Sequence, residues 1–215
     1  MKEENRNKTI LHLCADTGSD TKPYADAGYN VILVGKSIGV ENFKPPPSVY
    51  GIIANPVCTE FSIARSGGKA RLGEEGLFLV RHCQRIIKEA NPNFWVIENP
   101  ATGKLKDYLG EPQMIYQPYE FGSAWSKKTA LWGKFNAPKK IYKDWEDVPK
   151  IDGFYVRSAN TKHNRATGKP QMYQLHKSAF KLIAEFQGLP EPKNDMEFRS
   201  LCSQKFAQAF FEANK

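Results

Sequence analysis

The chain has 215 residues and a formal net charge of +8, and its 40% hydrophobic and 25% charged residues argue against a globally disordered protein. No apolar run approaches the roughly 20 residues that a membrane helix needs, and the polar residues 1–8 show no signal-peptide pattern. The basic balance favours a polyanionic partner, nucleic acid first. The cysteines form no CxxC pair, which indicates neither a disulfide framework nor a zinc ribbon and fits a reducing cytoplasm; they are Cys14, Cys58, Cys83 and Cys202.

The first half of the chain alternates strand-like and helix-like segments. The expected strands are residues 9–13, 29–34, 50–54 and 94–97, and the expected helices are residues 23–27 and 76–90. The strand at 94–97 is nearly all apolar, which is typical of a strand buried on both faces. Strands separated by helices predict a parallel α/β sheet with its ligand site at the carboxyl ends of the strands.

The second half is less regular. We expect a strand at residues 130–132 and helices at residues 177–187 and 203–213. Residues 157–181 contain six Lys or Arg and no acid, with aromatic residues interleaved. No change in composition requires two folding units, so we expect a single domain over residues 1–215, in which residues 136–195 could form a partly separate, small basic lobe.

Three segments with chemical potential follow expected strands. A Gly-containing turn, residues 14–19, follows the first strand and lacks the GxGxxG pattern of a dinucleotide site. Cys58 follows the third strand directly after Asn55-Pro56-Val57, and Glu98 comes at the end of the fourth strand. Taken singly, each has an ordinary explanation: a strand-to-helix turn, a small buried cysteine and a loop or cap carboxylate.

In this order and spacing, the three segments resemble the DNA cytosine-5 methyltransferase family, most closely its small phage-type members. The similar segments are "LHLCADTGSDTKPYADAGYNVILV", "IIANPVCTEFS", "FWVIENP", "YEFGSAWSKKTALWGKF" and "RSLCSQKFAQAFFEAN". They span roughly residues 9–135 and 199–214. The resemblance implies an α/β, Rossmann-like S-adenosylmethionine-dependent methyltransferase fold with a small basic lobe, in a bacterial or phage-infected cell.

The resemblance also implies a mechanism. Cys58 would add as a thiolate to carbon 6 of a cytosine, and Glu98 would hydrogen-bond to ring N3 and recognise the exocyclic amine. The base must be flipped out of double-stranded DNA or already unpaired. S-adenosylmethionine would be the methyl donor and S-adenosylhomocysteine the product. The expected cofactor-binding residues are Asp16, Thr17, Gly18, Ser19, Gly35, Glu41, Asn55 and Pro56.

Basic residues supply the candidate DNA contacts. Lys127 and Lys128 lie in the segment that resembles the one contacting the flipped nucleotide. Further candidates are Arg65, Arg157, Lys162, Arg165 and Lys169. The alternative for Arg65 is a surface salt bridge, and the alternative for the stretch from residue 157 is a solvated loop. His163 and His176 have no Cys or acid at ligand spacing, so we expect no metal site.

The chain departs from the family pattern in three places. Val57 replaces the second proline of Pro-Pro-Cys. The second strand ends Val34-Gly35-Lys36, without the acid that binds ribose hydroxyls, a role that Asp16 or Glu41 could take over. Ser126-Lys127-Lys128-Thr129 replaces Gln-x-Arg-x-Arg and loses the bidentate geometry of Arg. Two alternatives therefore stay open: modification of another pyrimidine, a free nucleotide or RNA on this scaffold, and a non-catalytic nucleic-acid-binding or decoy protein.

Overall fold

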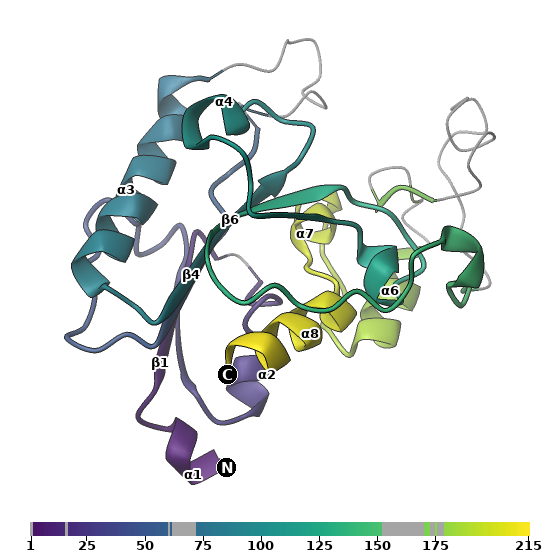
Figure 1. Ribbon diagram of the computed structural model, residues 1–215, viewed down its shortest axis with the longest axis horizontal. Coiled ribbons are helices and arrows are strands. Elements are labelled where there is room, and N and C mark those ends of the chain that lie inside the picture. The colour runs from purple at the N-terminus through teal and green to yellow at the C-terminus, as the bar shows by residue number, and fades with distance from the viewer. Residues whose placement is uncertain are drawn as a thin grey trace.

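The computed structural model describes residues 2–15, 17–59, 61, 72–151, 170–172, 175 and 179–215. Within these residues, six strands form one sheet in the order β2-β1-β3-β4-β6-β5 (Figure 1). The strands are β1 Thr9–Leu13, β2 Asn30–Val34, β3 Gly51–Ala54, β4 Phe94–Pro100, β5 Met114–Tyr116 and β6 Thr129–Lys134. The helices are α1 Lys2–Asn5, α2 Lys22–Asp26, α3 Glu74–Ala90, α4 Lys106–Leu109, α6 Ala179–Gln187, α7 Asp195–Ser200 and α8 Gln204–Asn214, with 3₁₀ turns η1 Pro118–Phe121 and η2 Trp145–Asp147.

The α/β class is confirmed, and the four strands expected in the first half, β1, β2, β3 and β4, are parallel to one another as predicted. The sheet continues with an antiparallel pairing that was not foreseen, since β6 is antiparallel to both β4 and β5. The cause lies between β5 and β6, where the described chain holds only the 3₁₀ turn η1. A parallel return needs a long crossover, usually a helix, so the chain instead reverses and β6 inserts between β5 and β4.

The alternation of side chains along the strands builds two hydrophobic layers. Leu11, Ile52 and Ile97 face the layer that contains α3, while Ile10 and Ile53 face the layer that contains α2 and α8. Figure 1 shows α3 and α8 on opposite sides of the sheet. Burial on both faces explains why these strands are almost entirely apolar.

Helix α3 begins two residues before the predicted start and ends where predicted. Asn91 ends it in the left-handed conformation, with φ +44°, and its N–H donates to the carbonyl of Ile87. Beneath the helix, the Sγ atoms of Cys14 and Cys83 lie 3.9 Å apart, and both cysteines are free. Cys14, just after β1, also has a positive φ of 56°.

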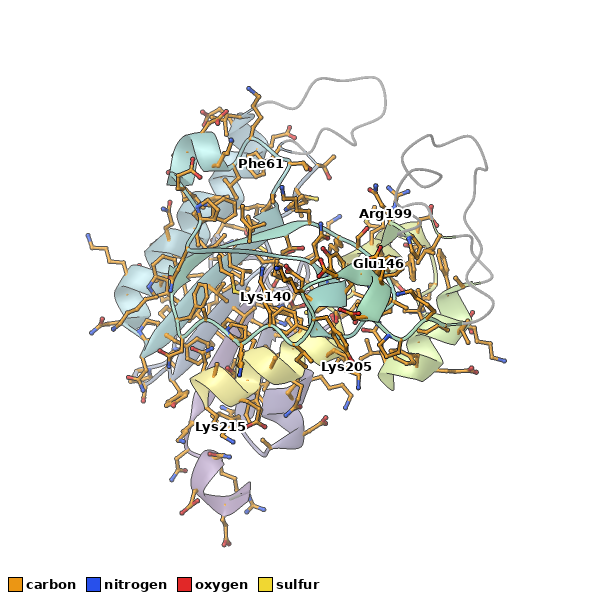
Figure 2. The ribbon with its side chains drawn as sticks, turned by 45° about the vertical axis from the view of Figure 1, so that its right-hand side comes forward. Phe61, Lys140, Glu146, Arg199, Lys205 and Lys215 are labelled. Atoms are coloured by element: carbon orange, nitrogen blue, oxygen red, sulfur yellow. The ribbon has the colours of Figure 1, made fainter. Side chains whose placement is uncertain are left out.

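A third cluster gathers around Trp125, beside the carboxyl end of the sheet. It joins Trp125 and Met172 to side chains of α6 and α7, with Phe180 stacked on Phe198 at 4.2 Å between ring centroids. The backbone of Ser126 bonds to Pro170 and Met172 on either side. Figure 2 shows Arg199 on α7 within this part of the molecule. Helix α7 and strand β5 were not predicted.

The order of the strands has a switch point beside β1. Strand β1 pairs with β2 on one side and with β3 on the other, so the connections leaving β1 and β3 diverge there. Ligands of open α/β sheets bind at such a switch point, at the carboxyl ends of the strands. None of the helices in the described ranges is long and apolar enough to cross a membrane.

Candidate active site

Strand β4 carries Glu98 past the end of its neighbour β3. Residues Phe94 to Ile97 pair with β3, whereas Glu98, Asn99 and Pro100 pair with β6 alone. The sequence suggested a strand ending before Glu98, so the observed strand is three residues longer than predicted. As a result, the Glu98 carboxyl group stands at the strand end, next to the segment that follows β3.

Asn99 ties that segment to β4. Its side chain is 1% exposed, and its Nδ2 donates to the carbonyl oxygen of Pro56 at 2.8 Å. The bond holds the backbone two residues before Cys58 against the strand that carries Glu98. Asn99 was not predicted as a site residue, although Asn99 belongs to the Glu-Asn-Pro segment.

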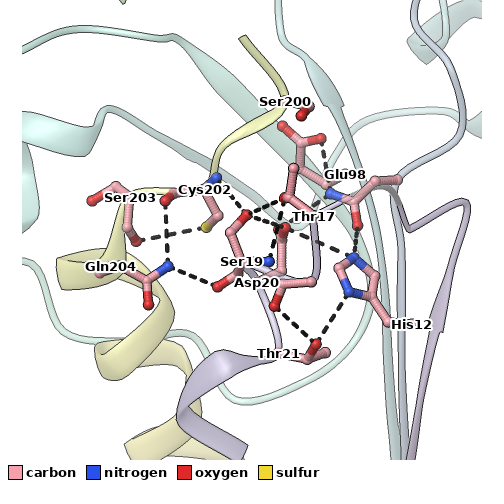
Figure 3. A network of polar contacts seen from close by, with 12 residues as sticks. His12, Thr17, Ser19, Asp20, Thr21, Glu98, Ser200, Cys202, Ser203 and Gln204 are labelled. Atoms are coloured by element: carbon pink, nitrogen blue, oxygen red, sulfur yellow. Dashed lines mark hydrogen bonds and ion pairs between the residues drawn. The ribbon is translucent and has the colours of Figure 1, made fainter. Parts of the chain in front are cut away.

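Asn55 stands at the centre of a polar network at the switch point. Its Nδ2 donates to Asp20 Oδ1 at 3.2 Å and to Glu98 Oε2 at 3.3 Å. Its Oδ1 lies 2.9 Å from Nε2 of His12, a β1 side chain that is 2% exposed. Figure 3 shows this network between the ends of β1 and β4. Neither His12 nor Asp20 was predicted as a site residue, because each is a single polar residue in a strand or turn.

The two adjacent lysines of the predicted pair have different places. Lys127 is half-buried, with its Nζ 4.0 Å from Glu98 Oε1, whereas Lys128 is exposed. The carbonyl oxygen of Lys128 accepts a hydrogen bond from the Ala101 amide, which aligns the start of β6 with the end of β4. Only Lys127 therefore joins the site around Glu98.

Burial raises the pKa values of the two predicted catalytic groups, Cys58 and Glu98. It raises the pKa of the Cys58 thiol, and the nearby Glu98 carboxyl adds to the rise while Lys127 opposes it. Burial likewise raises the pKa of Glu98, against the opposing charge of Lys127 and in the same direction as Asp20. Both groups therefore hold their protons more tightly than they would in water.

The site also shapes Lys127. Burial lowers the pKa of its ammonium group. The surrounding acids and thiols, Glu98 first and then Cys202, raise this pKa by more than burial lowers it, so that it ends above its ordinary value. Lys127 is thus a fixed positive charge beside Glu98. A fixed cation there favours any step in which negative charge develops nearby.

A pocket of about 290 Å³, counting its solvent-open mouth, lies in front of Glu98 and Lys127, and Cys58 is not among the residues that line it. Asp20, Asn55, Glu98 and Lys127 form its polar wall. The rest of the lining consists of two aromatic residues, a proline and the segment before α8: Tyr116, Trp125, Pro118, Ser200, Leu201, Cys202 and Ser203. Cys202 therefore borders the site.

The turn after β1 is fixed to the closing segment of the chain. Ser19 is buried, and its Oγ accepts a hydrogen bond from the Cys202 amide at 3.0 Å. Gln204 Nε2 donates to the Ser19 carbonyl oxygen at 2.7 Å, as Figure 3 shows. Thr17 Oγ1 donates to Ser19 Oγ at 3.1 Å. The Ser19 side chain thus serves this internal bridge.

The remaining predicted cofactor residues lie around the ends of β1 and β2. Gly18 has φ +69°, and a Cβ there would lie 3.2 Å from a methyl of the partly exposed Leu33. Gly35 needs to be glycine, since a Cβ would lie 2.5 Å from the carbonyl oxygen of Ala15. Glu41 is exposed, with its carboxylate against Gly39.

Six predicted site residues fall outside the described residues: Asp16, Arg65, Arg157, Lys162, Arg165 and Lys169. Their roles stay predictions. Within the described part of the chain, no group of three or more His, Cys, Asp or Glu is placed to hold a metal ion.

These features define an α/β protein with a polar site of a thiol, a carboxyl group and a lysine at the carboxyl ends of its strands. A viral protein named "Probable DNA (cytosine-5)-methyltransferase", from Frog virus 3 (isolate Goorha), is 32% identical to the chain over 126 residues. The match covers 52% of this chain and 58% of the viral protein. The resemblance found from the motifs is thereby confirmed as a sequence similarity.

Two further comparisons concern known protein families and solved structures. No model of a known protein family matches the chain. A crystal structure of an E. coli protein described as a "putative DNA modification methyltransferase encoded within prophage" superposes with a TM-score of 0.46 and 15% identity. That superposition covers 73% of this chain and 61% of the prophage protein.

Proposed function

We propose that this protein is an S-adenosylmethionine-dependent DNA methyltransferase that acts on carbon 5 of cytosine. The observation that carries the proposal is the meeting of Asn55, Glu98 and Lys127 at one edge of the sheet, because Asn55 belongs to the segment that carries Cys58 three residues further on. The similarity to the viral protein named as such an enzyme supports it. The chain spans just over half of that relative's length, so substrate and activity rest on the proposal.

The chemistry assigns each group a task. Carbon 5 of cytosine is a weak nucleophile until a thiolate adds to carbon 6, which converts the ring to an enamine. Cys58 supplies that thiolate. Glu98, whose pKa is raised chiefly by burial, can donate a proton to ring N3 as negative charge develops there.

Completion of the reaction restores Cys58. S-adenosylmethionine would supply the methyl group to carbon 5 as an electrophilic sulfonium and would leave as S-adenosylhomocysteine. Loss of the carbon 5 proton to a base then re-forms the double bond and expels the Cys58 thiolate. Lys127 keeps a positive charge beside Glu98 throughout and stabilises the negative charge that develops at the site.

The residues around the ends of β1 and β2 fit the cofactor in part. Gly18 offers a turn that a ligand can approach closely, flanked by the apolar side chain of Leu33. The carboxylate that would hold ribose hydroxyls is missing directly after β2, and we assign that role to the exposed Glu41 further along the same connection. S-adenosylhomocysteine should therefore bind the wild-type protein in a calorimetric titration.

A covalent trap tests the reaction itself. DNA containing 5-fluorocytosine should form a stable adduct at Cys58 in the presence of S-adenosylmethionine, because fluorine cannot leave as the carbon 5 proton does. Mass spectrometry of the tryptic peptides identifies the attacking cysteine. Cys58→Ser should form no adduct, whereas Cys14→Ala, which removes a thiol under α3, should react normally.

The outcomes separate the proposal from its alternatives. An adduct on RNA or a free nucleotide, but not on DNA, would transfer the same chemistry to another substrate. Binding of DNA without binding of S-adenosylhomocysteine and without an adduct would overturn the enzymatic proposal in favour of a non-catalytic DNA-binding protein.

A further inference from the structure

His12 is a buried side chain whose two ring nitrogens both have partners. Nδ1 lies 3.1 Å from Thr21 Oγ1, and Nε2 lies 2.9 Å from Asn55 Oδ1. The ring bridges the switch point, since it extends from β1 to the first residue after β3. An apolar residue would fill this buried position at lower cost, because burial of a polar ring is unfavourable unless the ring is hydrogen-bonded. We therefore ask what the hydrogen bonds of the imidazole do.

The neighbours of Asn55 fix the direction of the bond from His12. The amide nitrogen of Asn55 must point to Asp20 and Glu98, because carboxyl oxygens accept hydrogen bonds from it. The amide oxygen then faces His12 and can only accept. His12 Nε2 must therefore carry a hydrogen and donate it.

Thr21 completes the arrangement from the other side of the ring. Its hydroxyl can donate to the carbonyl oxygen of Gly18 at 3.2 Å or to His12 Nδ1. The ring is thus held in its plane at both nitrogens. The Nε2 hydrogen is directed at the Asn55 oxygen, and Asp20 Oδ2 lies further away, 3.8 Å from the same nitrogen.

We propose that His12 is a positioning residue for the carboxyl group of Glu98, acting through the side-chain amide of Asn55. Without the donor at Nε2, the Asn55 amide loses the contact that selects its orientation. It can then rotate and turn its oxygen towards Glu98 and Asp20. The proposal rests on the proposed function only in that Glu98 is taken as the group that contacts the base.

Two conservative variants separate the two nitrogens of the ring. His12→Gln places an amide nitrogen near the position of Nε2 and can still donate to Asn55. His12→Asn places its amide near the position of Nδ1 and reaches Thr21 instead. Both variants remove the ring, and Asn is one methylene smaller than Gln. A role in packing alone would therefore lower the free energy of unfolding, more in His12→Asn, without a selective change in the pKa of Glu98. His82→Gln, on the outer side of α3, controls for loss of a histidine.

The first measurement is independent of any reaction. Carbon-13 NMR of the glutamate carboxyls, assigned with Glu98→Gln, reports the pKa of Glu98. Burial raises that pKa and the hydrogen bond from Asn55 opposes the rise, so loss of the bond should raise it further. The other groups that face Glu98 stay unchanged in both variants: Asp20, Cys58, Lys127 and Cys202.

We expect the pKa of Glu98 to be higher in His12→Asn than in His12→Gln, with His12→Gln close to wild type. Equal values in the two variants would overturn the proposal. If both variants fail to fold, Asn55→Ala, a smaller change at the half-buried next position in the relay, should raise the pKa of Glu98 in the same way. An unchanged value in Asn55→Ala would also overturn it.

The second measurement is the rate of adduct formation with 5-fluorocytosine DNA. A misplaced acid slows such a step by up to about 100-fold. We expect a loss in His12→Asn of this order, rescued in His12→Gln, with DNA affinity unchanged in both. If the wild-type protein forms no adduct but the pKa of Glu98 still differs between the variants, the proposed function fails and the positioning role stands.

Discussion

Lys127 and Lys128 are neighbours in the chain with opposite surroundings, and the contrast makes them a natural pair of probes. Lys127 points to Glu98 and lowers the pKa of Cys58, while Lys128 is exposed. Both were predicted to contact nucleic acid. The structure brings only Lys127 into the site, so the pair separates local electrostatics from general charge.

Lys127→Gln should slow alkylation of Cys58 by iodoacetamide at pH 8. Loss of the ammonium removes the first of the effects that lower the pKa of Cys58 against burial and Glu98, so the pKa rises and the thiolate fraction falls. A tenfold fall would correspond to one pKa unit, and we expect a decrease of about 3- to 10-fold. The labelled Cys58 peptide is quantified by mass spectrometry.

Lys128→Gln, which removes the same charge from an exposed position, should leave the alkylation rate unchanged. Equal slowing in both variants would show that Cys58 responds to net charge and not to Lys127.

Glu98→Gln should stabilise the protein at neutral pH. The pKa of Glu98 is raised in the folded state, chiefly by burial, so stability falls as the pH rises above the ordinary glutamate pKa of about 4.3. Glutamine removes this cost, and the melting temperature at pH 7 should therefore rise.

The gain from Glu98→Gln should shrink as the pH is lowered towards about 4, where the wild-type carboxyl is protonated in both states. Scanning calorimetry across this range measures it. Glu75→Gln, an exposed carboxylate on α3, is the control. A gain that does not depend on pH would mean that ionisation of Glu98 is not its source.

At the scale of elements, the close pairing of β4 with β6 fixes the position of Glu98. Val96 lies opposite Gly133 in the antiparallel ladder, and a Cβ at Gly133 would lie 2.1 Å from the backbone oxygen of Trp95. Trp132 next to it is anchored by its indole N–H, which donates to the Gly110 carbonyl oxygen. The glycine thus permits the two backbones to approach.

Gly133→Ala should therefore destabilise the fold by about 1–3 kcal/mol or more, the range typical of overpacking, because backbone cannot yield as a side chain can. Urea denaturation measures the change. Gly110→Ala provides the comparison: its φ of +80° is strained for alanine, but nothing lies within 4 Å of the added methyl. A smaller effect at Gly133 than at Gly110 would contradict the role of close backbone approach.

The elements that could be predicted from the sequence are those with a local signal. The apolar runs of β1, β3 and the start of β4 and the helical spacing in α3 give their positions to within a few residues. The end of β4 could not be predicted, since Glu-Asn-Pro has the composition of a loop and becomes strand only by pairing with β6.

The site divides in the same way. Cys58 and Glu98 were found because their segments resemble a known family. His12 and Asp20 were missed because a polar network depends on the order of strands in space, which single residues do not signal.

At the scale of the whole molecule, the net charge of +8 predicts an electrostatic contribution to DNA binding. Neutralising four residues of the basic stretch to Gln should reduce the slope of log affinity against log salt by roughly 3 units if all four contact phosphate. These residues are Arg157, Lys162, Arg165 and Lys169. Fluorescence anisotropy with labelled DNA at several salt concentrations measures the slope.

A matched set of four exposed lysines on other elements changes the net charge by the same amount. It consists of Lys88, Lys134, Lys205 and Lys215. This control should leave the slope nearly unchanged. If both sets reduce the slope equally, binding responds to overall charge, and the stretch from residue 157 is not the phosphate path.

The overhang of β4 beyond β3 has a consequence for dissection of the chain. A fragment that ends at residue 110 would contain both Cys58 and Glu98, and by composition it would look like a minimal catalytic unit. Yet the last three residues of β4 pair as a strand with β6 alone, and β6 lies beyond that end point. The fragment should therefore leave the acid on a frayed strand end, and adding residues 111–215 as a separate polypeptide should be needed to restore adduct formation.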